Sequence, residues 1–248
     1  MPRVSVDGVL FDIDDTLVDT RGAFGHALRA IAHRYLPDVT STGHDAIVAH
    51  WRADAADHFR AYTRGEETSR GQRMARANEL HAAFGGQELD DVAFTAWNTL
   101  FEDGFERAWR AHADVTACLD VLETAGVAVG ALSNAAVTYQ THKLARVGLA
   151  ERVPMLVGVD TLGVGKPDPR VFVEACRRLG TEPSRTAYVG DELDVDACAA
   201  RAAGLLGVWV DRPGGRRQVV LQADLDAAYV AGVVVVTSLL DLPGVLGV

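Results

Sequence analysis

The chain has 248 residues, of which 48% are apolar and 23% are charged, so it can bury a sizeable core and is not a disordered tail or linker. This length indicates one or two domains. The formal net charge of −10 repels nucleic acid and anionic membrane surfaces, so we expect neither as a partner. A small anion that binds together with a divalent metal ion is not excluded.

The cysteines and the apolar segments favour a soluble, cytoplasmic protein. Cys118, Cys176 and Cys198 match no disulfide framework or zinc spacing, and we expect them to be small core residues. The N-terminal segment reaches acidic residues before a signal-peptide apolar stretch could develop. The uncharged run at 227–240 holds 14 residues, whereas a bilayer span needs about 20.

Strand and helix patterns follow one another in chain order. An apolar strand at 9–11 leads into the carboxylate-rich segment DIDDT at 12–16. No strand is expected between 17 and 112, which we interpret as a helical insertion with a loop at 63–71. Beyond it, predicted strands and helices alternate: strands at 127–132, 155–159, 186–189, 207–210 and 233–236, and helices at 114–125, 136–147, 169–179 and 194–203.

This alternation predicts an α/β fold, a Rossmann-like parallel sheet covered by helices, with a helical cap domain inserted after the first strand. The predicted domains are a Rossmann-like core, made of residues 1–16 together with 113–248, and a helical cap, made of residues 17–112. Within the insertion, five aromatic residues recur at helical spacing. We expect them to be its own core, with a base-stacking platform as the alternative: Phe94, Trp97, Phe101, Phe105 and Trp109.

Polar clusters follow four of the predicted strands: DIDDT, SNA, DTLGVGKPD and GDELDVD. Ligands of parallel sheets bind beyond the carboxyl ends of the strands, so these clusters are expected to meet in one site. Asp12 and Asp14 can both face one cavity only if the backbone after the strand departs from regular strand geometry. A cation between the two carboxyl groups would allow both to be ionised. One could then act as a nucleophile and the other move a proton. The alternative is an aspartate cluster that caps a turn.

The four clusters together resemble the haloacid dehalogenase-like (HAD) hydrolase superfamily, whose motifs match DIDDT, LSN at 132–134, Lys166 in GKPDP and GDELDVD. The likeness extends from Val9 to Val210. The place of the insertion resembles the subgroup whose helical cap follows the first motif, in which cap opening would admit substrate and closure would exclude water.

The resemblance implies a Mg2+-dependent phosphatase acting on a small-molecule phosphate monoester. Asp12 would attack phosphorus and form an aspartyl-phosphate, and Asp14 would protonate the leaving oxygen and then activate water. Mg2+ would be held by the Asp12 carboxylate, the Asp14 backbone carbonyl and Asp191. Asp196 would orient the lysine or the waters of the metal, with a helix-start charge as its alternative.

The phosphate-binding residues implied by the resemblance are Thr16, Ser133, Asn134 and Lys166. Ser133 lies where a strand ends and a helix begins, which suits a phosphate oxygen, although Ser133 or Asn134 could instead be the N-cap of that helix. Lys166 is one of only two lysines, with Lys143, and its alternative is a solvated surface lysine. Asp168 can cap the helix after Lys166, with Pro169 in the first turn.

Several family activities compete with this interpretation. Asp14 argues against a haloacid dehalogenase, which lacks a second carboxylate in the first motif. A sugar phosphomutase of the same fold retains both carboxylates and remains the main alternative, followed by a member that binds phosphorylated ligands without turnover. The sequence departs from the family at Asp15, often glycine, and at Glu192, often serine.

Substrate choice depends on the insertion, where Arg21, His26, Arg70 and Arg73 could contact the organic part of the substrate or be solvated or ion-paired. We expect a small phosphorylated metabolite as the partner, no nucleic acid or membrane, and a monomer or homodimer.

Overall fold

A computed structural model describes residues 6–216 and 219–248, so the first five residues of the N-terminal segment lie outside the described residues. The chain divides into two compact units. The first comprises the residues up to Val18 together with Ala111–Val248, and the second is Asp19–Arg110. These limits lie two residues inside the insertion limits expected from the sequence. Each unit is described below by itself.

The first unit is built on a six-stranded sheet in the order β3-β2-β1-β4-β5-β6, in which every pairing is parallel. This confirms the predicted Rossmann-like α/β fold. The strands are β1 (Gly8–Phe11), β2 (Ala128–Leu132), β3 (Met155–Val157), β4 (Thr186–Gly190), β5 (Leu206–Val210) and β6 (Val234–Val236). Strand β1 is central and fully buried. The strand order reverses beside it, and this is where ligands of such sheets bind.

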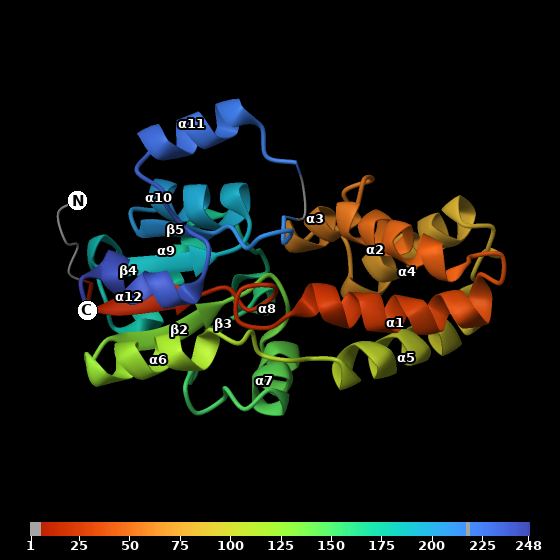
Figure 1. Ribbon diagram of the computed structural model, residues 1–248, viewed down its shortest axis with the longest axis horizontal. Helices are drawn as coiled ribbons and strands as arrows, with labels where there is room; N and C mark the ends of the chain where they lie inside the picture. Colours follow the sequence, from red (N-terminus) through yellow and green to blue (C-terminus); the bar gives the residue numbers. More distant parts are fainter. Residues whose placement is uncertain (1–5, 217–218) are drawn as a thin grey trace. The chain divides into compact units, whose positions relative to one another are not determined.

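Helices cover both faces of this sheet (Figure 1), with α9 and α10 on one face and α6 and α12 on the other. The helices are α6 (Val115–Thr124), α7 (Val137–Arg146), α8 (Val159–Leu162), α9 (Pro169–Leu179), α10 (Ala199–Ala202), α11 (Gln222–Val230) and α12 (Leu242–Leu246), with short turns η2 (Pro183–Arg185), η3 (Leu193–Cys198) and η4 (Leu239–Asp241). The predicted start of α9 is confirmed, because Asp168 accepts a hydrogen bond from the backbone N–H of Arg170 and Pro169 follows it in the first turn.

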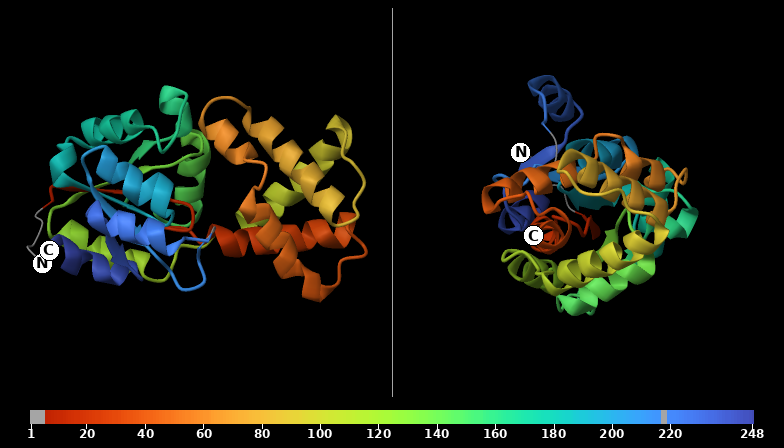
Figure 2. Two further views of the ribbon diagram at one scale, coloured as in Figure 1. Left: turned by 90° about the horizontal axis from the view of Figure 1, so that it is seen from above. Right: turned by 90° about the vertical axis from the view of Figure 1, so that its right-hand side faces the viewer.

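The second unit is helical, and the residues described in it form no strand. It contains α1 (Thr20–Tyr35), η1 (Ser41–Gly43), α2 (His44–Ala53), α3 (His58–Thr63), α4 (Ser69–Ala83) and α5 (Asp91–Arg107). Figure 2 shows α1 beside α5, and the two helices pack together. A Cβ atom at Gly104 would lie 3.1 Å from the Cα of Ala27, so the glycine permits this close approach.

The aromatic side chains predicted to face one way are buried in the second unit, on α5 and just beyond its end: Phe94, Trp97, Phe101, Phe105 and Trp109. Phe105 stacks on Phe24 of α1 with ring centroids 4.4 Å apart. This packing confirms that the aromatic residues form the unit's own core.

Cys118 and Cys176 are buried as expected, Cys198 is half-buried, and all three are free thiols. Among the residues that the structure describes, no helix is long and apolar enough to cross a lipid bilayer.

Candidate active site

The chain leaves strand geometry immediately after β1. The backbone N–H of Asp12 still bonds to the carbonyl of Val189 on β4, at 2.8 Å. The backbone N–H groups of Leu17 and Val18 then both bond to the carbonyl of Ile13, at 3.0 and 2.9 Å. This tight turn is the departure from regular strand geometry that the spacing of Asp12 and Asp14 required.

Asp15 adopts the left-handed conformation in this turn, with a φ of 59°. Glycine reaches that region without strain, and aspartate is among the few other residues that tolerate it. The departure from the family's frequent glycine at this position is therefore compatible with the backbone.

Lys166 lies in the middle of the buried part of the site. Its ammonium group donates to Oδ1 of Asp12 at 2.6 Å, to the hydroxyl of Tyr188 at 2.6 Å and to Oδ1 of Asp196 at 2.7 Å. The side chain is buried, so it is not a solvated surface lysine. Burial alone would lower the pKa of Lys166, but the carboxylates of Asp12 and Asp196 outweigh this effect and raise the pKa well above its usual value. Lys166 is therefore a fixed positive charge beside Asp12.

The loop after β4 adds two further carboxylates. Asp191 accepts a hydrogen bond from the Thr16 hydroxyl at 3.4 Å, and its backbone carbonyl accepts one from the indole N–H of Trp209 at 2.8 Å. Asp196 lies on the π-helical turn η3, where its Oδ2 accepts from the backbone N–H of Glu192 at 2.9 Å. Thr16 is fully buried, and the contact described for its hydroxyl is with Asp191.

The carboxyl groups of Asp12, Asp191 and Asp196 each offer an oxygen, and these oxygens lie within 4.8 Å of one another. Burial raises the pKa of Asp12 to about 8 against the opposing effect of Lys166, and the charges of Asp196 and Asp14 add to the rise. Burial also raises the pKa of Asp191 well above its usual value, together with the nearby Asp15, Asp196 and Glu192. If all three acidic groups are ionised, they carry more negative charge than Lys166, which contacts Asp12 and Asp196, can offset.

This deficit of positive charge fits a divalent cation. Carboxylate oxygens are the ligands that Mg2+ prefers, and the ion usually takes only one or two of them from the protein. Asp196 uses both of its oxygens, on Lys166 and on the Glu192 backbone. Asp12 and Asp191 are therefore the carboxylates best suited to hold the ion, as the resemblance implied.

Asp14 is held from helix α7. Its Oδ1 accepts from the Lys143 ammonium group at 2.5 Å, and its Oδ2 accepts from the Gln140 amide at 2.6 Å. Neither Gln140 nor Lys143 is among the site residues predicted from the sequence. The available signal was the scarcity of lysine, because both lysines of the chain contact carboxylates of the first motif.

The segment after β2 positions two side chains differently from each other. Ser133 is buried, and its Oγ accepts from the Gln140 amide at 2.8 Å. Asn134 uses both ends of its amide on the backbone of Lys166, at 2.6 and 2.9 Å. Asn134 thus positions the Lys166 loop in this structure. The alternative in which Ser133 or Asn134 caps α7 is wrong, because Ala136 is the N-cap residue.

In the second unit, two of the residues considered for substrate contact are ion-paired. Arg70 pairs with Asp91 at 2.9 Å, and Arg73 contacts Glu102. Arg21 and His26 are exposed on α1. The ion-paired interpretation therefore holds for Arg70 and Arg73.

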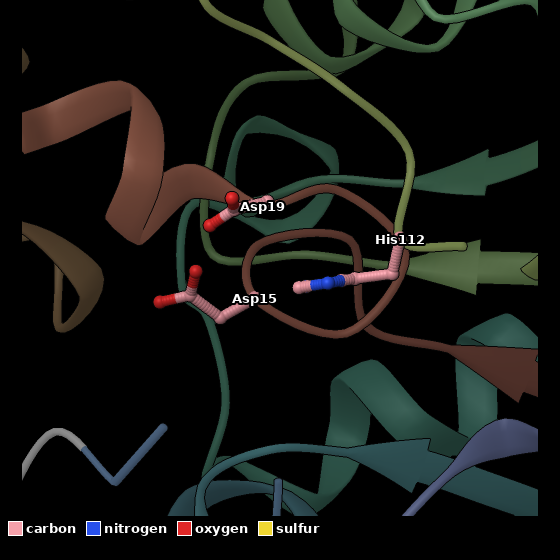
Figure 3. A group of neighbouring side chains, drawn as sticks. All are labelled: Asp15, Asp19 and His112. Atoms are coloured by element: carbon pink, nitrogen blue, oxygen red, sulfur yellow. The ribbon is translucent and has the colours of Figure 1, made fainter. Parts of the chain in front are cut away.

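Figure 3 shows Asp15, Asp19 and His112; Asp15 and His112 belong to the first unit, and Asp19 is the first residue of the second. Asp19 accepts a hydrogen bond from the backbone N–H of Gly22 at 2.7 Å and so caps α1. Because Asp19 has this structural role, we assign no metal ion to these three residues.

Comparison with known proteins identifies the family. A family model described as haloacid dehalogenase-like hydrolase matches residues 6–204. The chain belongs to this family. The match covers all four polar clusters at the strand ends, and it confirms the HAD hydrolase resemblance and with it the class of enzyme.

Curated relatives of this HAD hydrolase include phosphatases. A phosphoglycolate phosphatase of Xylella fastidiosa is 30% identical over 223 residues, which cover 87% of this chain and 86% of that protein. A glyceraldehyde 3-phosphate phosphatase of Methanopyrus kandleri is 38% identical over 101 residues, covering 41% of this chain and only 43% of that protein.

Among solved structures, the HAD hydrolase YfnB of Bacillus subtilis, determined with bound magnesium, shares the fold. Its TM-score is 0.78 at 19% sequence identity, and the match covers 98% of this chain and 100% of that chain. At this identity the likeness supports the fold alone.

Proposed function

We propose that this HAD hydrolase is a Mg2+-dependent phosphatase that hydrolyses a small-molecule phosphate monoester through an aspartyl-phosphate on Asp12. The observation that supports it is the environment of Asp12, which contacts Lys166 at 2.6 Å on one side and lies in the acidic group with Asp191 and Asp196 on the other. A nucleophilic carboxylate that lies between a lysine side chain and a proposed metal site is suited to attack an anionic substrate.

The first half of the reaction forms the covalent intermediate. An oxygen of ionised Asp12 attacks phosphorus, and the bond between phosphorus and the leaving oxygen breaks. Asp14 gives its proton to that oxygen, so a neutral alcohol departs. Lys166 stabilises the charge on the phosphoryl oxygens, and Ser133 donates a hydrogen bond to one of them.

The second half regenerates the enzyme. Asp14, now ionised, takes a proton from water, and the hydroxide formed attacks phosphorus. The bond between phosphorus and Asp12 breaks, which releases inorganic phosphate and returns the Asp12 carboxylate. Mg2+, held by Asp12, Asp191 and the backbone carbonyl of Asp14, would reduce the repulsion between the anionic nucleophile and the anionic ester.

The helical unit at 17–112 would act as the cap that sets substrate choice. In this proposal the enzyme is a cytoplasmic monomer or homodimer whose partner is a small phosphorylated metabolite, with no role for nucleic acid or membrane.

Release of phosphate from an aryl phosphate and from a panel of metabolite monophosphates tests this function. We expect turnover that requires Mg2+ and is abolished in Asp12→Asn. Conversion of a sugar 1-phosphate into its isomer, with no free phosphate, would instead favour the phosphomutase. The absence of any turnover across the panel would favour a ligand-binding member of the family.

A further inference from the structure

Helix α7 carries two polar side chains that are almost completely buried. Gln140 and Lys143 are 0% and 1% exposed. They are three residues apart, which places them on the same face of the helix. Buried amide and ammonium groups require partners, and both residues find theirs in Asp14.

Gln140 connects two parts of the site that are far apart in sequence. Its amide nitrogen donates to Oδ2 of Asp14 at 2.6 Å and to Oγ of Ser133 at 2.8 Å. Both amide hydrogens are therefore used. The amide oxygen is buried with no hydrogen-bond partner among the described residues. The carboxylate fixes this orientation, because a flipped amide would place its oxygen against another acceptor.

The contact with Gln140 also determines what Ser133 can do. The hydroxyl oxygen of Ser133 accepts from the Gln140 amide and, at 3.3 Å, from the backbone N–H of Ala135. A hydroxyl has two acceptor positions and one hydrogen. With both acceptor positions used, the remaining hydrogen can be donated to an oxygen that only accepts, such as that of a phosphoryl group.

Lys143 holds the second oxygen of Asp14. Its Nζ lies 2.5 Å from Oδ1 and its side chain is 2% exposed, whereas the side chain of Asp14 is 38% exposed. Asp14 is thus restrained on the side that faces α7 and accessible on another side. This arrangement suits a group that must meet a leaving oxygen or a water molecule in one defined orientation.

We propose that Gln140 and Lys143 are positioning residues: Lys143 and Gln140 together orient the Asp14 carboxyl, and Gln140 also orients the Ser133 hydroxyl as a phosphate donor. The inference rests on the proposed phosphatase function. It assigns different effects to the two residues, because the hydrogen bond to Ser133 comes from Gln140.

The leaving group distinguishes positioning of Asp14 from a general structural defect. An alkyl phosphate releases a poor leaving group that needs the proton from Asp14, whereas p-nitrophenolate leaves with little assistance. We expect Lys143→Met to lower kcat/KM about 30-fold for an alkyl phosphate and less than about threefold for p-nitrophenyl phosphate. Lys143→Arg, which retains the charge, should recover part of the loss.

Gln140→Met should show the same dependence on the leaving group and, in addition, weaker binding of inorganic phosphate. Loss of one oriented hydrogen bond predicts a roughly fivefold rise in the inhibition constant of phosphate. Lys143→Met should raise that constant less than Gln140→Met does, because the hydrogen bond to Ser133 comes from Gln140. Arg146→Met removes an exposed cation from the same helix and should change none of these values.

Crystal structures of the wild type, Lys143→Met and Gln140→Met complete the test without relying on turnover. We expect the Asp14 carboxyl to rotate away from α7 in the variants while Asp12 and Lys166 stay in place. Equal losses on both esters, or an unmoved Asp14 in correctly folded variants, would overturn the positioning role. A wild type that hydrolyses neither ester would overturn the proposed function instead, and the structures would still decide the positioning.

Discussion

The ammonium nitrogen of Lys166 lies 2.6 Å from a carboxylate oxygen of Asp12, although the two residues are 154 positions apart in the sequence. Strand β1 delivers Asp12 to the sheet edge, and Asn134 holds the backbone of Lys166 through both ends of its amide. The pair gives the proposed nucleophile a permanent positive neighbour inside the protein. We therefore first predict the effect of removing the Lys166 ammonium group.

Lys166→Met should lower kcat/KM for an aryl phosphate on the order of 10²–10³-fold, because the phosphoryl oxygens lose a fixed positive charge. The change also leaves Asp12 and Asp196 without their shared cation, and breaking such a buried pair costs about 3–5 kcal/mol. Steady-state kinetics and urea unfolding measure the two effects. Arg178→Met, which removes an exposed cation on α9, should retain wild-type activity, and a Lys166→Met enzyme that retains it too would contradict the assignment.

Metal binding should stabilise the folded protein through Asp191. A ligand at about 100 times its dissociation constant adds about 2.7 kcal/mol to the free energy of unfolding. We therefore expect Mg2+ to raise the Tm of the wild type and EDTA to reverse the rise. Asp191→Asn should lose the response, while Asp194→Asn, which changes an exposed acid on the adjacent turn η3, should keep it. Equal responses in both variants would place the metal elsewhere.

We expect the charge of Asp114 to make a pH-dependent contribution to the free energy of unfolding. This contribution is separate from the proposed reaction. Burial alone would raise its pKa, but hydrogen bonds from Arg212, Ser238 and Leu239 outweigh this effect and lower it to about 2, from an ordinary value of 3.8. The folded form thus prefers the ionised acid. Its contribution, about 2 kcal/mol, is present above pH 4 and is lost as the pH falls toward 2.

Urea unfolding of the wild type and Asp114→Asn across this pH range measures that contribution. The difference in unfolding free energy should be largest near neutral pH and should shrink between about pH 4 and 2. Asp224→Asn, an exposed change on α11, serves as the matched control. A difference that stays constant with pH would show that Asp114 acts through packing rather than through its charge.

The left-handed backbone conformation of Asp15 should restrict which residues position 15 accepts without loss of stability. Asp15→Gly and Asp15→Asn should keep the Tm near the wild-type value, because both residues tolerate a φ of 59°. Asp15→Val should cost about 1–2 kcal/mol, which corresponds to a Tm lower by roughly 3–6 °C. Differential scanning calorimetry of the metal-free proteins checks the order, and a valine variant as stable as the glycine variant would refute it.

The features of this protein that can be predicted from sequence are those that depend on residues close together in the chain. The apolar run before Asp12 and the apolar strands that follow the insertion specify a parallel sheet, and Asp168 with Pro169 marks the start of α9. The same pattern brings Lys166 and Asp191 to the sheet edge that carries Asp12, since parallel strands end together.

The contacts of Gln140 and Lys143 could not be predicted in this way. Their spacing is ordinary for a helix, and only the orientation of α7 decides whether that face meets solvent or Asp14. The same limit applies to Asn134, whose amide could reach a phosphate, a helix end or, as found, the Lys166 backbone. Side chains held by tertiary contacts leave no periodic signal in the sequence.

The central claim is that Asp12 carries the phosphoryl group. A crystal structure of the wild type soaked with Mg2+ and beryllium fluoride, which mimics a phosphoryl group on a carboxylate, tests it most directly. The account predicts a beryllium fluoride adduct on a carboxylate oxygen of Asp12. An adduct on any other side chain would contradict it.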